Sequence, residues 1–310
     1  MVRNMKVQFL DRVILILNLV FIRFDAFINN YIELTFLYIF LTLFSEFTGI
    51  QTLSTNPIQL LLTLNILVVS THYVYSITYV INDILDFEDM QKLGVNEDKY
   101  SFYKLRPIVY YNRSLITVLY LVALHITFLI LLSVSLTSTI LIYPPLLTAL
   151  TLMHSKSKKF RPITFACLRI LKYILFLTLL QHYLHVTTIR FIIYAFLTLI
   201  LLIIPYHIAT YTKSKTLLWQ IPLHHHVKPV IVILFTGSLV MLIRLIHLNI
   251  FIPFVKSLLI AFTPFLITRQ ILRFVLGASN PNVYIHIKRL VIFFIIAIVL
   301  SLIILIAYVE

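Results

Sequence analysis

Apolar side chains come in long, nearly uninterrupted blocks, and this feature limits the possible folds more than any other. Hydrophobic residues make up 61% of the 310 residues and charged residues 12%, whereas soluble domains average about 45–50% and about 25%. The blocks exceed what a core helix of a globular protein requires, so the expected solvent is the bilayer. A single cysteine, Cys167, excludes a disulfide framework and a cysteine-based zinc site. We therefore predict an all-α polytopic membrane protein.

Nine segments have the roughly 20 mostly apolar residues that a membrane-spanning helix needs. The stretch before the first of them is apolar but interrupted by charges, and we expect it to form an interfacial helix, with a tenth span as the alternative. The sequence thus predicts an interfacial segment over residues 1–30 and one transmembrane domain over 31–310. The expected spans are 31–50, 58–82, 114–133, 135–153, 163–183, 189–210, 229–247, 250–272 and 284–308.

Lysine and arginine residues gather in alternate loops, at 92–113, 156–161, 213–228 and 273–289. By the positive-inside rule these loops are cytoplasmic, in a protein of the cell membrane. The N-terminus falls on the same side, and nine spans then place Glu310 outside. The net charge of +14 is explained by these loops and by phosphate ligands, so no nucleic-acid partner is expected.

Acidic residues concentrate at the cytoplasmic end of the second expected span. Six of the 11 lie between positions 83 and 98, and none occurs from Lys99 to Val309. On a helix, Asp83 and Asp86 share a face, and Asn82 neighbours Asp86. Two carboxylates and an amide are hard oxygen ligands that suit Mg²⁺ bridged to a phosphate. A solvated acidic helix end is the alternative, but ionised side chains bordering a bilayer are usually functional.

A cationic pair, Lys104 and Arg106, follows about twenty residues after the carboxylates and precedes Pro107. Such a pair could hold diphosphate oxygens opposite the metal. The alternative is that these cations only set the membrane topology.

These residues resemble a signature of the UbiA-type membrane prenyltransferases. The family pattern N-D-x-x-D at the end of the second helix matches Asn82-Asp83-x-x-Asp86, and the later R-P matches Arg106-Pro107. A basic stretch after the fourth helix is similar to His154-Ser155-Lys156-Ser157-Lys158-Lys159. The resemblance in topology covers nearly the whole chain, and the resemblance in motif covers about positions 79–107.

The resemblance implies nine helices around a central cavity, and transfer of an isoprenyl group from a polyprenyl diphosphate to an unidentified acceptor. It implies Mg²⁺ as cofactor and membrane lipids as surroundings. The implied metal ligands are Asn82, Asp83 and Asp86. The implied catalytic residues are Asp83, Asp86, Lys104 and Arg106. The implied substrate-binding residues are Asn82, Asp89, Tyr79, Lys156, Lys158, Tyr211, Lys213 and Lys215.

The chain departs from the family pattern at two places. The third aspartate of the first motif is replaced by Met90, with Asp89 one position early. The second aspartate-rich motif, expected after the sixth helix, falls on residues 205–215, which contain no acid. Either Lys213 and Lys215 contact the diphosphate where a second metal would sit, or the protein is a degenerate member that binds an isoprenoid lipid or acts as a membrane subunit. A transporter is a further alternative, although no paired repeat is visible.

Overall fold

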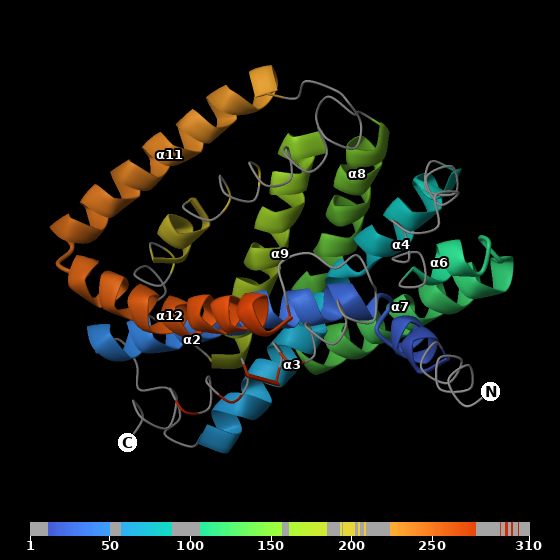
Figure 1. Ribbon diagram of the computed structural model, residues 1–310, viewed down its shortest axis with the longest axis horizontal. Helices are drawn as coiled ribbons and strands as arrows, with labels where there is room; N and C mark the ends of the chain where they lie inside the picture. Colours follow the sequence, from blue (N-terminus) through green and yellow to red (C-terminus); the bar gives the residue numbers. More distant parts are fainter. Residues whose placement is uncertain are drawn as a thin grey trace.

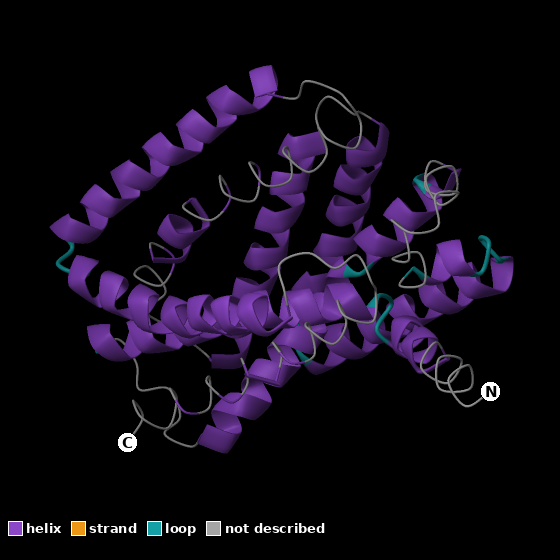
Figure 2. Cartoon of the chain, in the orientation of Figure 1, coloured by secondary structure: helices purple, strands orange, loops and turns teal. Residues whose placement is uncertain are grey.

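The structure is a computed structural model, and it describes residues 12–49, 57–88, 106–156, 161–184, 193, 195–201, 204, 208, 224–276, 292, 295–296, 299 and 303. These residues are almost entirely helical, and no strand occurs among them (Figure 2). The prediction of an all-α protein is confirmed for this part of the chain.

A short helix over residues 12–20 and a turn over 21–23 lead into the first long helix, α2. This helix begins at Phe24, seven residues before the expected span. The other helices follow in chain order (Figure 1). They are α2 (Phe24–Thr48), α3 (Pro57–Tyr75), α4 (Ile77–Leu85), α6 (Pro107–Tyr110), α7 (Leu115–Ser135), the 3₁₀ helix η2 (Ser138–Ile142), α8 (Tyr143–Lys156), α9 (Arg161–Leu184), α11 (His224–His247) and α12 (Phe251–Leu276).

Four helices of the described part are long and apolar enough to cross a membrane, by length and composition. A fifth candidate is the pair Val232–His247 and Phe251–Thr263, whose axes meet at 119°. Two of the nine expected spans, 189–210 and 284–308, lie largely outside the described residues. A third, 135–153, overlaps the 14-residue helix α8, which is shorter than a span. The four helices are Phe24–Thr48, Ile58–Leu85, Leu115–Ser135 and Arg161–His182.

Specific residues explain where several helices begin and end. Gly49 closes α2 with a φ of 62°, a left-handed conformation that glycine adopts without steric cost. Asn249 follows α11 and is also in the left-handed region, with a φ of 58°. Pro107 opens α6, and a proline also pushes the residue before it into an extended conformation. Arg106 accordingly has φ −118° and ψ 99°.

The long helix α2 packs between α12 and α3, and α9 packs against α3 and α8 (Figure 1). Aromatic side chains fill the contact with α12, where the Phe40 ring lies edge-on to Phe254 at 5.4 Å between centroids. The short helix α4 continues α3 past Ser76 and lies beside α8. This arrangement brings the end of α4 close to the end of α8 and the start of α9.

The outer face of α7 is apolar and exposed. It carries Leu115, Ile116, Leu119, Ile130 and Val134, all more than half exposed. A contiguous apolar face of this kind is what a lipid-facing helix presents. Together with the candidate spans, it supports a membrane location.

Candidate functional site

Arg106 and Asp83 form a direct ion pair at the end of α4. The Nη1 atom of Arg106 donates to Asp83 Oδ1 at 3.0 Å. The Asp83 side chain is 3% exposed and that of Arg106 is 24% exposed. Because Pro107 holds Arg106 in an extended conformation at the start of α6, the guanidinium reaches α4 from the following segment. The two parts of the sequence pattern, 23 residues apart, therefore meet in space.

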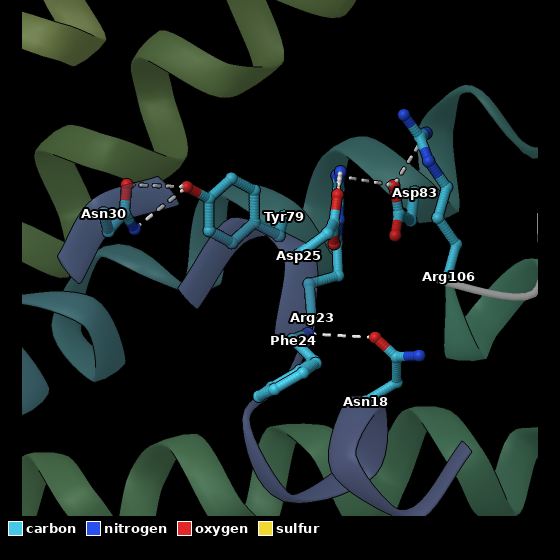
Figure 3. A network of polar contacts seen from close by, with 8 residues as sticks. All are labelled: Asn18, Arg23, Phe24, Asp25, Asn30, Tyr79, Asp83 and Arg106. Carbon is cyan, nitrogen blue, oxygen red and sulfur yellow. Dashed lines mark hydrogen bonds and ion pairs between the residues drawn. The ribbon is translucent and has the colours of Figure 1, made fainter. Parts of the chain in front are cut away.

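A second arginine, Arg23, approaches Asp83 from the N-terminal turn (Figure 3). Its Nη1 atom lies 3.7 Å from Asp83 Oδ1, and its Nη2 atom lies 3.1 Å from Asp25 Oδ2. Burial lowers the pKa of Arg23, but the charges of Asp25 and Asp83 outweigh burial, so this pKa is raised above its ordinary value. The Oδ1 atom of Asn18 accepts a hydrogen bond from Phe24 N at 2.9 Å and so fixes the start of α2 beside Arg23.

The end of α8 and the start of α9 contact the same end of α4. The Ser155 hydroxyl donates to Asn82 Oδ1 at 3.4 Å. Arg161 lies 3.5 Å from Asp86 Oδ1 and also donates to the carbonyl oxygens of His154 and Ser155, at 3.2 and 3.1 Å. A cation at a helix C-terminus is favourable because the last carbonyls there lack intrahelical partners. The three segments quoted for the family resemblance therefore converge at one place.

A line of polar side chains leads from this place into the helices. The Arg23 guanidinium lies over the Tyr79 ring, 5.1 Å from its centroid. The Tyr79 hydroxyl accepts a hydrogen bond from Asn30 Nδ2 at 3.1 Å, as Figure 3 shows. Asn30 Nδ2 also lies 3.1 Å from His72 Nδ1, and Asn30 Oδ1 accepts from Lys172 at 3.3 Å.

This line ends at a second group of charged residues, on α2 and α9. The Glu33 carboxylate accepts a hydrogen bond from Arg169 Nη1 at 2.7 Å. It also accepts hydrogen bonds from Lys172 and from the Tyr173 hydroxyl. Lys172 is completely buried. We call Glu33, Arg169, Lys172 and Tyr173 the inner cluster, and the residues around Asp83 and Asp86 the outer site.

The donor types at the outer site suit Mg²⁺, since carboxylate and amide oxygens are its usual protein ligands. In the structure, however, Asp83 bonds to Arg106, Asp86 to Arg161 and Asn82 to Ser155. Within the described ranges, no three His, Cys, Asp or Glu side chains lie close enough together to hold a metal ion. In this structure all three oxygen donors are bonded to protein partners, and the predicted use of Mg²⁺ stays a prediction.

The structure brings together five of the predicted site residues, namely Tyr79, Asn82, Asp83, Asp86 and Arg106. Lys156 is exposed at the end of α8, next to Ser155. The remaining six lie outside the described residues: Asp89, Lys104, Lys158, Tyr211, Lys213 and Lys215.

Sequence reasoning missed several members of these groups, including Arg23, Arg161 and the whole inner cluster. One signal was available for the inner cluster. Arg169 and Lys172 stand at i and i+3 within an otherwise apolar span, so they share a helix face. Ionisable side chains inside a membrane span are rare and usually mark a functional site. Glu33 gave the same signal in the first span, but nothing in the sequence indicated its partners.

Comparison of the chain with known protein families, with curated proteins and with solved structures finds no match.

Proposed function

We propose that the protein is an integral-membrane transferase that moves an isoprenyl group from a polyprenyl diphosphate to an acceptor molecule. One observation carries the proposal. The sequence segments that resemble the prenyltransferase pattern are far apart in the chain, and they meet at the outer site through the Arg106–Asp83 and Ser155–Asn82 contacts. If the short motifs matched the family pattern only by chance, the matching segments would have no reason to lie together in the structure.

The charges of the outer site suit a diphosphate group. Arg23, Arg106 and Arg161 all point at the end of α4, and a guanidinium has five N–H donors in a planar fork that fits phosphate oxygens. Arg106 is the most exposed of the three. Of the three guanidinium groups, that of Arg106 is therefore the one that a phosphate arriving from outside reaches first.

The reaction breaks the C1–O bond of the isoprenyl diphosphate, and the diphosphate leaves with the electron pair. C1 then bonds to the acceptor, which loses a proton. Arginines facing the leaving group stabilise the negative charge that develops on it, which is electrostatic catalysis. The apolar helices around the site keep water away from the allylic cation. Magnesium dependence through Asn82, Asp83 and Asp86 is part of this proposal and is tested below.

A second candidate function is binding of an isoprenoid lipid without turnover, or a role as a membrane subunit. The observation in its favour is that Asp83 and Asp86 are already neutralised by Arg106 and Arg161. A site whose carboxylates are permanently paired would hold a lipid diphosphate through its arginines but would recruit no metal. A transporter is the third candidate, from a different class.

The test uses purified protein and geranylgeranyl diphosphate, with and without Mg²⁺. Mass spectrometry of lipids incubated with the protein and this diphosphate shows whether a prenylated product appears, and release of inorganic diphosphate is measured in parallel. A transferase yields both products. Binding without either product favours lipid binding without turnover. Absence of binding contradicts both the transferase and the lipid-binding role, and leaves a membrane subunit or the transporter.

A further inference from the structure

The inner cluster is the second concentration of charge in the described part of the chain, and the proposed reaction at the outer site does not use it. Lys172 lies eleven residues after Arg161 and ten before His182, in the middle of a candidate membrane span. At 1.5 Å per residue it lies about 16 Å along α9 from the outer site. Its side chain is completely buried. A charge at this depth is costly unless an opposite charge balances it.

The cluster contains one carboxylate and two basic side chains. Both carboxylate oxygens of Glu33 accept hydrogen bonds, one from Arg169 and Lys172 and the other from the Tyr173 hydroxyl. Acceptance at both oxygens suits an ionised carboxylate. A guanidinium does not lose its proton in a protein, so Arg169 already balances Glu33. A protonated Lys172 would therefore add a positive charge to a pair that is neutral without it.

No second acid belongs to the cluster among the described residues. The other acids of α2 lie elsewhere, because Asp25 pairs with Arg23 and Glu46 is exposed near the opposite end of the helix. The sequence has no acid from Lys99 to Val309. Charge balance within the described cluster therefore favours an uncharged Lys172.

The hydrogen bonds around Lys172 match a neutral amine, which has two N–H groups and one lone pair. Lys172 Nζ donates to two oxygens, that of Glu33 and Oδ1 of Asn30 at 3.3 Å. Asn30 Nδ2 in turn donates to His72 Nδ1 at 3.1 Å. The His72 proton then sits on Nε2, which donates to the Phe21 carbonyl at 2.7 Å. His72 is therefore also neutral and adds no charge near Lys172.

Tyrosines form the rest of the titratable surroundings of Lys172. Its Nζ atom lies 5.1 Å from the centroid of the Tyr173 ring on α9 and 5.9 Å from that of the Tyr75 ring on α3. Tyr79 of α4 reaches the cluster through Asn30 (Figure 3). The described contacts of α8 and α11, which also pack against α9, place no titratable group at Lys172. Aromatic faces attract an ammonium group, so these rings are favourable neighbours for Lys172 once it carries a proton.

We propose that the inner cluster is a proton-binding site, in which Lys172 is a neutral amine at rest and takes up one proton on the lone pair of Nζ. Uptake changes the net charge of the cluster from zero to one positive charge. Arg169 and Glu33 are 23% and 19% exposed, and they mark the side by which the proton arrives. The proposal rests on the contacts and charges of the cluster and does not depend on the transferase function.

The direct test is carbon NMR of the full-length protein in micelles, with every lysine labelled with ¹³C at Cε. The Cε signal of a lysine reports whether its Nζ atom is protonated. Ordinary lysines keep their proton up to about pH 10, so at about pH 8 the proposal expects one neutral lysine signal. This signal should be absent from Lys172→Met and present in Lys256→Met, which removes an exposed cation of α12. A parent protein in which every lysine is protonated at that pH would overturn the proposal.

Variants of the two charged partners test the charge balance. In Arg169→Gln, Glu33 has lost its cation, so Lys172 should take up the proton and the neutral signal should disappear. In Glu33→Gln, Arg169 is unbalanced, so Lys172 should stay neutral to a lower pH than in the parent. A neutral signal that persists in Arg169→Gln at the same pH as in the parent would overturn the proposal, because the cluster would not control the proton.

Unfolding in mixed micelles gives a second readout. An unfolded lysine keeps its proton up to about pH 10, so a folded parent with a neutral Lys172 holds one proton fewer than its unfolded chain. Above about pH 8, the unfolding equilibrium constant of the parent should therefore fall about tenfold per pH unit relative to that of Lys172→Met. The same pH dependence in both proteins would overturn the proposal. If Lys172→Met does not fold, Arg169→Gln takes its place, because its Lys172 is protonated in both states.

Discussion

Asp83 is the residue on which the outer site depends most, because its carboxylate is almost fully buried and faces two arginines. We expect Asp83→Asn to lower prenyl transfer by about 100-fold or more, the range seen when one electrostatic contact to a transition state is lost. The amide keeps the shape of the side chain and can still accept a hydrogen bond, but it loses the negative charge that attracts Arg106 and Arg23, and it is a poorer ligand for the predicted Mg²⁺. The measurement is the initial rate of product formation at saturating Mg²⁺.

The matched control for this variant is Glu88→Gln, which removes an exposed carboxylate from the same stretch of chain. It should change the rate by less than about twofold relative to the parent, since substitutions of surface charges away from buried pairs and networks have small effects. An Asp83→Asn protein as active as the Glu88→Gln protein would contradict the role proposed for Asp83.

At the scale of single residues, the sequence indicated which polar side chains come together but not their actual partners. Asn82, Asp83, Asp86 and Arg106 were expected to lie at one site, and the structure places them close together, whereas their binding of a diphosphate stays a prediction. Their bonds to one another and to Arg23 and Arg161 could not be predicted, because those partners lie between 23 and 75 positions away along the chain. Such contacts depend on how the helices pack, and no local pattern encodes that.

Among the helices, Arg161 connects three elements, since it bonds to Asp86 at the end of α4 and to two carbonyls at the end of α8. Replacing it by methionine removes one cation from the part-buried Asp86 carboxylate and two donors from the carbonyls of α8. Breaking such a pair costs about 3–5 kcal/mol, whereas replacing both partners by apolar residues is close to neutral. We therefore expect Arg161→Met to lower the free energy of unfolding by about 3 kcal/mol.

A double-mutant cycle with Asp86→Leu measures this connection, using unfolding in mixed micelles. The double variant should recover most of the stability that Arg161→Met loses. If the two effects simply add, the contact between α4 and α9 contributes nothing to stability and the account of how α4 is held is wrong.

The helices themselves were largely predictable, because apolar blocks of the right length are a local property of the sequence. The spans expected at 58–82, 114–133 and 163–183 coincide closely with Ile58–Leu85, Leu115–Ser135 and Arg161–His182. The span expected at 135–153 instead divides into η2 and α8. Pro144 and Pro145 stand at the start of α8 and lack the N–H groups that would continue a helix from the preceding residues.

For the whole molecule, the prediction is a chain with cytoplasmic loops on one face and short external loops on the other. Ser135 ends α7 and is exposed, Ser155 lies near the end of α8, and Asn249 joins α11 to α12. Cysteines at these positions, in a Cys167→Ser background, should be labelled from outside the cell at 135 and 249 and only from the cytoplasm at 155. Labelling of 135 and 155 from the same side would contradict the topology, and labelling of 249 from the cytoplasm would make the bent pair a re-entrant loop.

The central claim is that the outer site binds the diphosphate of an isoprenoid substrate, and its most direct test is titration of geranylgeranyl diphosphate into the protein and into Arg106→Gln. Arg106 should contribute at least one charge-assisted hydrogen bond to phosphate, so its loss should weaken binding about tenfold or more. The control Lys256→Gln, at an exposed cation on α12, should bind like the parent. Equal affinity of the parent and Arg106→Gln, or no binding by the parent at all, would contradict the account.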